Sequence, residues 1–156
     1  MEGTALILAG GGGKGAYEIG VWGAMRELGI DKEITAVSGA SVGGLNGALF
    51  VQGDYDRARQ IWLTMNAEKI LDPGRLNLID ELKAMVERWP DVEAESLMKE
   101  GIFSRDGLVQ IIREELDVNR VAQSGIPCCL ACYNVTSNLM DYINVTGMKQ
   151  NDMETI

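Results

Sequence analysis

The sequence predicts an α/β fold with a parallel sheet, and the order of its first four segments carries this prediction. A short apolar run, Thr4–Ala9, has the length of a buried strand. From Lys14 to Leu28 apolar side chains recur at helical spacing, and Ile34–Val37 predicts a second strand. The small apolar residues Val42–Val51 predict a helix that packs closely on a sheet. Because strand–helix–strand units connect parallel strands by right-handed crossovers, we expect one parallel sheet.

The remainder of the chain adds further helices and two more strands. Helices are expected over Tyr55–Met65, Leu76–Trp89 and Arg105–Leu116, the last capped by Ser104, with a helix cap at Asn151-Asp152 and a C-cap at Gly29 for the first helix. A buried strand is expected over Pro127–Val135, and an alternating one over Met140–Val145 is joined to it through Thr136–Asn138. We find no internal repeat or linker and expect residues 1–156 to form one domain.

Composition excludes several classes of protein. With 46% hydrophobic and 24% charged residues, the 156-residue chain has the balance of a soluble globular domain. A net charge of −9 argues against nucleic acid as a partner and gives no attraction to anionic lipid surfaces. Peripheral membrane contact through apolar surface stays open. The sequence contains neither a membrane-spanning run nor a basic, signal-like start, so we expect a cytoplasmic protein.

Three cysteines, Cys128, Cys129 and Cys132, lie close together in the predicted buried strand. An odd, clustered set does not form a disulfide framework. The chain has no histidine and no second cysteine cluster, which argues against a metal site. We therefore expect these cysteines to be small buried side chains in a reducing compartment, and we expect neither metal nor cofactor.

The pentapeptide Gly39-Ala40-Ser41-Val42-Gly43 follows the second predicted strand and has the Gly-x-Ser-x-Gly pattern of a nucleophile elbow. In such a turn a strand passes sharply into a helix and presents the serine Oγ. A serine hydroxyl needs a base to become a nucleophile, and the chain contains no histidine. The base must therefore be a carboxylate or, less favourably, a lysine. The pattern predicts a serine–aspartate dyad with Ser41 as the nucleophile.

A glycine-rich loop, Gly10-Gly11-Gly12-Gly13-Lys14-Gly15, lies between the first predicted strand and helix. It lacks the spacing of a phosphate-binding P-loop, and the acidic residue of a dinucleotide site is missing after the second strand. One alternative is that the loop is only a tight turn and binds no ligand. Alternatively, the N–H groups of Gly10, Gly11, Gly12 and Gly13 form an oxyanion hole that Val42 completes. Since both loops follow parallel strands at one sheet edge, together they favour acyl transfer.

At these residues the chain resembles the patatin-like phospholipase family. The resemblance rests on Gly10–Gly15 followed by Ala16–Val21, and on Val37–Ala48; it is tight over the first fifty residues and loose beyond. It implies a three-layer sandwich related to the α/β-hydrolases and a lipid acyl hydrolase of phospholipase A or esterase type that needs no metal. The implied roles are Ser41 as nucleophile, Gly10–Gly13 as oxyanion donors, Lys14 as the basic residue of the loop, and Gly15, Gly39 and Gly43 as supporting residues.

The chain departs from the family at the catalytic aspartate, which the family carries in Asp-Gly-Gly or Asp-Gly-Ala. Neither tripeptide occurs here. We interpret Asp106 as a helix N-terminal acid, Asp141 as part of a solvated strand face and Asp152 as a cap. We therefore expect a fold incomplete at its C-terminus, a chain weakly active or inactive by itself, and self-association through exposed sheet.

Two alternatives to a hydrolase stay open. The first is an inactive relative that acts by binding or self-association. The second is an acyltransferase of the malonyl-transferring kind, which shares Gly-x-Ser-x-Gly but uses a histidine base.

Overall fold

The computed structural model describes residues 3–64, 105–134 and 136–149. Contacts divide the chain into two compact units, one made of Met1–Thr64 with Ile112–Ile156 and the other of Met65–Ile111. In the second unit only residues 105–111 are described. The expected helix over Leu76–Trp89 and the expected caps at Ser104 and Asn151-Asp152 lie outside the described residues. The single domain stays a prediction.

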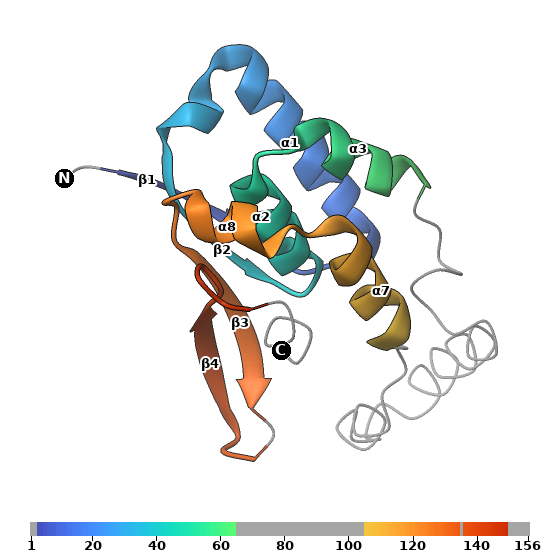
Figure 1. Ribbon diagram of the computed structural model, residues 1–156, viewed down its shortest axis with the longest axis vertical. Coiled ribbons are helices and arrows are strands. Elements are labelled where there is room, and N and C mark those ends of the chain that lie inside the picture. Colours follow the sequence, from blue (N-terminus) through green and yellow to red (C-terminus); the bar gives the residue numbers. More distant parts are fainter. Residues whose placement is uncertain (1–2, 65–104, 135, 150–156) are drawn as a thin grey trace, which may run out of the picture. The chain divides into compact units, whose positions relative to one another are not determined.

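Four strands form one sheet in the order β1 (Thr4–Leu8), β2 (Ile34–Ala40), β3 (Cys128–Asn134) and β4 (Leu139–Asn144) (Figure 1). The first three run parallel, as predicted, and β4 pairs with β3 in the antiparallel direction. The turn between β3 and β4 is short and holds Asn138 in the left-handed region (φ 60°), so the chain reverses as a hairpin. The α/β class is confirmed, and the sheet is mixed.

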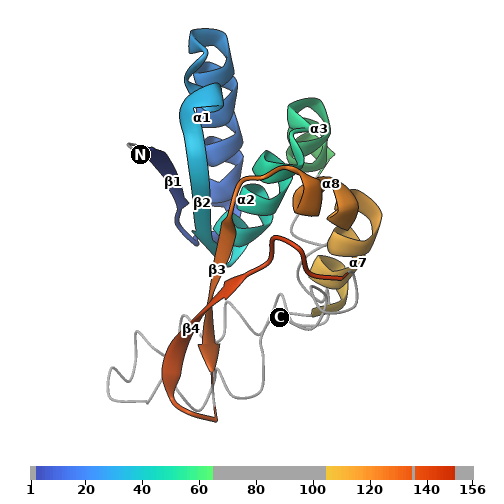
Figure 2. The ribbon, with the colours of Figure 1, turned by 60° about the vertical axis from the view of Figure 1, so that its left-hand side comes forward.

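Helix α2 (Val42–Gln52) packs on the sheet, and helices α1 (Gly15–Leu28) and α3 (Tyr55–Thr64) pack on α2 and on each other (Figure 2). Helix α1 ends at Gly29, whose left-handed φ of 75° suits the predicted glycine C-cap. Two short 3-10 turns, η1 (Gly12–Lys14) and η2 (Ile30–Glu33), flank it. None of the helices in the described ranges is long and apolar enough to cross a bilayer.

Two helices follow in the later part of the chain, α7 (Arg105–Glu115) and α8 (Val118–Gln123). The sequence predicted α7 but not α8. The cap of α8 is Asp117, whose carboxylate accepts hydrogen bonds from the backbone N–H groups of Asn119 and Arg120 at 3.0 and 3.2 Å. In the sequence, α8 could have been recognised from Asp117, a typical N-cap residue, in front of the short segment Val118–Gln123.

The core is built around α2, whose residues from Gly43 to Gln52 are all buried. Small residues permit this: a Cβ added at Gly47 would lie 3.0 Å from the Val37 side chain. A helix that is apolar all round suits such a central position. At its far end, the ring of Trp22 lies 5.0 Å from that of Phe50.

The prediction that the third strand is buried holds for only part of it. Cys128 is fully buried, whereas Cys129 and Cys132 are half-buried and Tyr133 is 54% exposed. The register explains the difference, because β2 ends at Ala40 opposite Ala131. Residues beyond Ala131 continue past the end of β2 and pair with β4 alone within the described sheet.

Candidate active site

Ser41 is the single residue between β2 and α2. Its backbone has φ 55° and ψ −129°, a conformation that residues with a side chain rarely adopt and that stores strain. The Ser41 carbonyl oxygen accepts hydrogen bonds from the N–H groups of Gly44 and Leu45 at 2.8 and 3.3 Å, which starts α2. The side chain is exposed. The geometry is that of a sharp strand-to-helix turn with its hydroxyl accessible.

The glycines on either side of Ser41 are required by close backbone contacts. A Cβ added at Gly39 would lie 2.2 Å from the Gly43 carbonyl oxygen. One added at Gly43 would lie 2.4 Å from the Leu8 carbonyl oxygen and 2.8 Å from that of Ala9. The absence of a side chain at Gly39 therefore lets the start of α2 lie close to β2, and its absence at Gly43 lets the same turn lie close to the end of β1.

The glycine-rich loop begins in contact with Ser41. A Cβ added at Gly10 would lie 3.2 Å from the Ser41 Cβ. Gly11 and Gly12 have φ values of 149° and 56°, which glycine adopts at little cost. Because β1 and β2 are parallel and Leu8 pairs with Gly39, the loop and the serine turn leave the sheet at the same edge.

The middle of the loop is open on its outer side. A Cβ added at Gly12 or Gly13 would meet no heavy atom within 4 Å. The Lys14 side chain folds back beside Gly11, since its Cδ would lie 3.0 Å from a Cβ at that position. Lys14 is exposed, and its N–H donates to the Gly11 carbonyl oxygen at 3.2 Å. The loop thus offers space for a ligand, and the positive charge of Lys14 lies close to this space.

The far end of the loop is held by a buried amide to which the sequence analysis assigned no role. Asn46 of α2 is 1% exposed, and its Nδ2 donates to the Gly15 carbonyl oxygen at 3.0 Å. Gly15 is also closed in by Trp62, because a Cβ at this position would lie 2.3 Å from the indole. The available signal was a single polar residue inside the small and apolar run Val42–Val51.

No carboxylate hydrogen-bonds the Ser41 hydroxyl among the residues that the structure describes. Asp141 is exposed on β4 and accepts a hydrogen bond from the Asn134 side chain at 2.9 Å. The side chain of Asp106 and all of Asp152 lie outside the described residues. The serine–aspartate dyad therefore stays a prediction.

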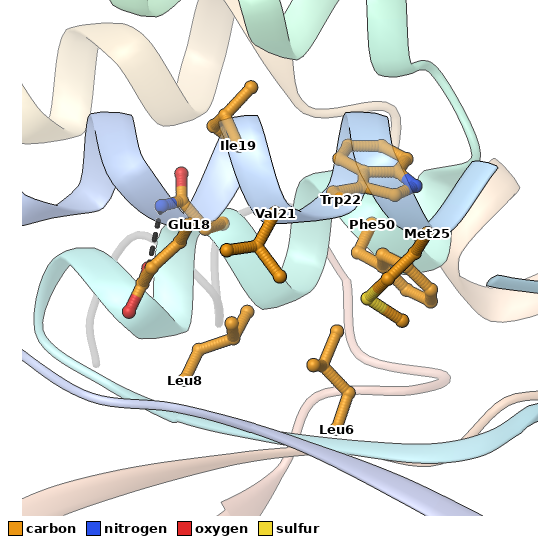
Figure 3. Close-up of a pocket in the computed structure, with 9 residues that line it drawn as sticks. Leu6, Leu8, Glu18, Ile19, Val21, Trp22, Met25 and Phe50 are labelled. Carbon is orange, nitrogen blue, oxygen red and sulfur yellow. Dashed lines mark hydrogen bonds between the residues drawn. The ribbon is translucent and has the colours of Figure 1, made fainter. Parts of the chain in front are cut away.

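A small apolar cavity lies between α1, α2 and β1 (Figure 3). The residues that line it are Leu6, Leu8, Glu18, Ile19, Val21, Trp22, Met25, Asn46 and Phe50. Its volume of about 20 Å³ has room for roughly one water molecule. An acyl chain does not fit in a cavity of this volume.

Two of the three cysteines, Cys128 and Cys132, are unsuited to act as nucleophiles. Burial, with a smaller contribution from neighbouring Cys129, raises the pKa of the Cys128 thiol to about 11. Burial, followed by the charge of Asp141, also raises the pKa of Cys132. Since the thiolate is the reactive form, both thiols are poor nucleophiles near neutral pH. All three cysteines are free.

Comparison with known families decides the affiliation of the chain. The family model described as Patatin-like phospholipase matches residues 6–149, a segment that contains both loops, most of β1 and the whole of β2, β3 and β4. The chain belongs to the patatin-like phospholipase family. This confirms the resemblance found in the two motifs, and membership in this family indicates lipid acyl hydrolase activity. No curated protein matches this patatin-like chain significantly.

Proposed function

We propose that this patatin-like chain supplies the nucleophile and the oxyanion hole of a lipid acyl hydrolase of phospholipase A or esterase type. The contact between Gly10 and Ser41 is the observation that carries the proposal. It supports a hole formed by the N–H groups of Gly10–Gly13 together with that of Val42, the first residue of α2. A helix N-terminus adds a favourable dipole for a developing negative charge.

In the proposed reaction the Ser41 Oγ attacks the carbonyl carbon of an ester while a carboxylate base accepts the hydroxyl proton. The carbonyl oxygen gains the negative charge and is bound by the glycine N–H groups. Collapse of the tetrahedral intermediate breaks the ester bond, and the base returns its proton to the departing alcohol. Water then attacks the acyl-serine, and the fatty acid leaves.

The identity of the base is the second part of the proposal. The chain has no histidine, so we assign the role to an aspartate that forms a dyad with Ser41. We place this aspartate outside the 156 residues, because neither an Asp-Gly-Gly nor an Asp-Gly-Ala tripeptide occurs in them. Without the base, the oxyanion hole and substrate binding retain only a small part of the rate enhancement. We therefore expect weak activity from the chain by itself.

A second candidate function is binding or self-association without catalysis. The observation that favours it is the hairpin of β3 and β4, which exposes several large side chains. These are Tyr133, Leu139, Met140 and Tyr142, with 54, 65, 48 and 71% of their surface accessible. Exposed apolar surface at a sheet edge promotes association.

A fluorophosphonate probe tests the proposed function, because it reacts covalently with nucleophilic serines and its phosphoryl oxygen is stabilised by an oxyanion hole. Because the proposed base is outside the chain, we expect slow but detectable covalent labelling of Ser41, located by peptide mass spectrometry, and slow hydrolysis of short- and long-chain p-nitrophenyl esters. Ser41→Ala should lose both signals. Ser38→Ala, in the same strand, should retain them. Equal ester hydrolysis by the unchanged chain and by Ser41→Ala would contradict catalysis and favour the second candidate.

A further inference from the structure

Asn46 lies in the middle of α2, five residues after Ser41, and connects three helices. Its Nδ2 donates to the Gly15 carbonyl oxygen at 3.0 Å and to the Glu18 carboxylate at 2.8 Å, the latter dashed in Figure 3. Its Oδ1 accepts from the Trp62 Nε1–H at 2.7 Å. Both N–H donors and the carbonyl oxygen of the amide are therefore paired, as a buried polar group requires.

Packing around Gly15 reinforces these hydrogen bonds. The Trp62 ring occupies the space that a side chain at position 15 would need, at 2.3 Å from the added Cβ. The same indole donates to Asn46, so Trp62 fixes both the amide and the glycine that the amide holds. Buried networks with every member paired rigidify their surroundings and select one arrangement.

The two ends of the glycine-rich loop are thus attached to one rigid segment. Gly10 packs on Ser41, and Gly15 is bound by Asn46. Ser41 and Asn46 belong to the same strand-to-helix unit, because α2 starts directly after the serine. Four residues lie between these two anchors.

We propose that Asn46 is a positioning residue that holds the oxyanion loop in register with Ser41. The inference rests on the proposed function, in which the loop N–H groups bind the developing oxyanion. Small displacements of such donors reduce the stabilisation of the transition state, by up to about a hundredfold in rate for a shift of roughly 1 Å. The effect of losing Asn46 should therefore fall on kcat rather than on KM.

Two substitutions disrupt the network in different ways. Asn46→Asp keeps the shape but replaces the two N–H donors by a carboxylate oxygen that faces the Glu18 carboxylate and the Gly15 carbonyl. Trp62→Phe leaves the Asn46 amide in place, but it removes the Nε1–H donor and part of the indole that packs against Gly15. A matched control is Gln52→Leu at the end of the same helix. Gln52 is 7% exposed, donates to the Glu115 carbonyl oxygen at 3.1 Å and accepts from the Asp117 N–H at 2.8 Å, all away from the loop.

Two readouts separate positioning from general stability. The first is the second-order rate constant of fluorophosphonate labelling at Ser41, which we expect to fall about tenfold or more in Asn46→Asp and by a smaller factor in Trp62→Phe. The second is hydrogen exchange of the Lys14 and Gly15 amides, which donate to the Gly11 and Gly12 carbonyl oxygens within the loop. We expect this exchange to accelerate in both variants. In Gln52→Leu neither readout should change beyond what its loss of stability produces elsewhere in the chain.

The outcomes distinguish this inference from the proposed function. Absence of Ser41 labelling in the unchanged chain contradicts the proposed function, and loop exchange then still decides whether Asn46 holds the loop. If the loop amides exchange hydrogen at the same rate in Asn46→Asp as in Gln52→Leu, the inference is overturned. Faster loop exchange with an unchanged rate of Ser41 labelling also overturns it, because the loop position would then not matter to the chemistry.

Discussion

Gly43 and Leu8 touch backbone to backbone, since a Cβ added at position 43 would lie 2.4 Å from the Leu8 carbonyl oxygen. This contact joins the first turn of α2 to the last residue of β1. The Leu8 carbonyl belongs to a strand end and cannot turn aside as a flexible side chain could. The relative position of the glycine-rich loop and Ser41 therefore depends on the absence of one side chain.

Gly43→Ala should destabilise the fold by about 2 kcal/mol or more, because the new methyl group meets two backbone carbonyl oxygens. Urea unfolding measures the change. The matched control is Gly20→Ala in α1, where a Cβ would meet no atom within 4 Å. There we expect a gain of about 0.5–1 kcal/mol, since alanine is the better helix former. Equal stabilities of the two variants would contradict the close contact between Gly43 and the Leu8 carbonyl oxygen.

Strain at Ser41 predicts a difference in stability between two variants that lack the hydroxyl group. Ser41→Ala keeps a Cβ at φ 55° and ψ −129°, whereas Ser41→Gly adopts this backbone without strain. We expect Ser41→Gly to be more stable than Ser41→Ala by about 1 kcal/mol. Thermal or urea unfolding of both proteins checks this. A glycine variant less stable than the alanine variant would show that the turn is unstrained.

The buried thiol of Cys128 predicts a loss of stability at alkaline pH. Its pKa is raised from 9.0 to about 11 by burial, so between these values the unfolded chain releases the proton and the folded chain keeps it. The stabilisation from the neutral thiol is complete below pH 9 and is lost as the pH rises through 11. Urea unfolding at neutral and alkaline pH measures it. Cys128→Ala should lose this part of the pH dependence, whereas Cys129→Ala should keep most of it, because Cys129 makes the smaller contribution to the raised pKa of Cys128.

An ion pair joins α3 to the end of α7. The Arg57 guanidinium donates to both carboxylate oxygens of Glu115, through Nε and through Nη2 at 2.8 Å. The Glu115 side chain is 14% exposed, so we expect a coupling energy of up to about 1 kcal/mol in a double-mutant cycle. The more exposed contact between Arg120 and Asp54, at 3.3 Å, should contribute less. Added salt should reduce both coupling energies. A larger coupling energy for Arg120 and Asp54 than for Arg57 and Glu115 would contradict this ranking.

The local signals in the sequence predicted the regular elements near the site well. Helical spacing and the Gly29 cap correctly predicted α1, and the run of small residues correctly predicted α2. The hexapeptide helix α8 was missed, because one turn and a half shows too little periodicity to be recognised. The exposure of Tyr133 was also missed. Whether a strand is covered depends on the length of its neighbour, and an apolar pattern does not contain this information.

The sequence by itself determined the parallel order of the first strands, the turn at Ser41 and the family of the chain. These features depend on glycine, on spacing and on apolar patterns, which act over a few residues. Only the tertiary structure decided that Asn46 and Trp62 hold Gly15 at the far end of the loop. These residues are separated by up to 47 positions in the printed sequence, and their hydrogen bonds exist only after three helices have packed together. Contacts of this range depend on the folded arrangement of helices, which no local pattern specifies.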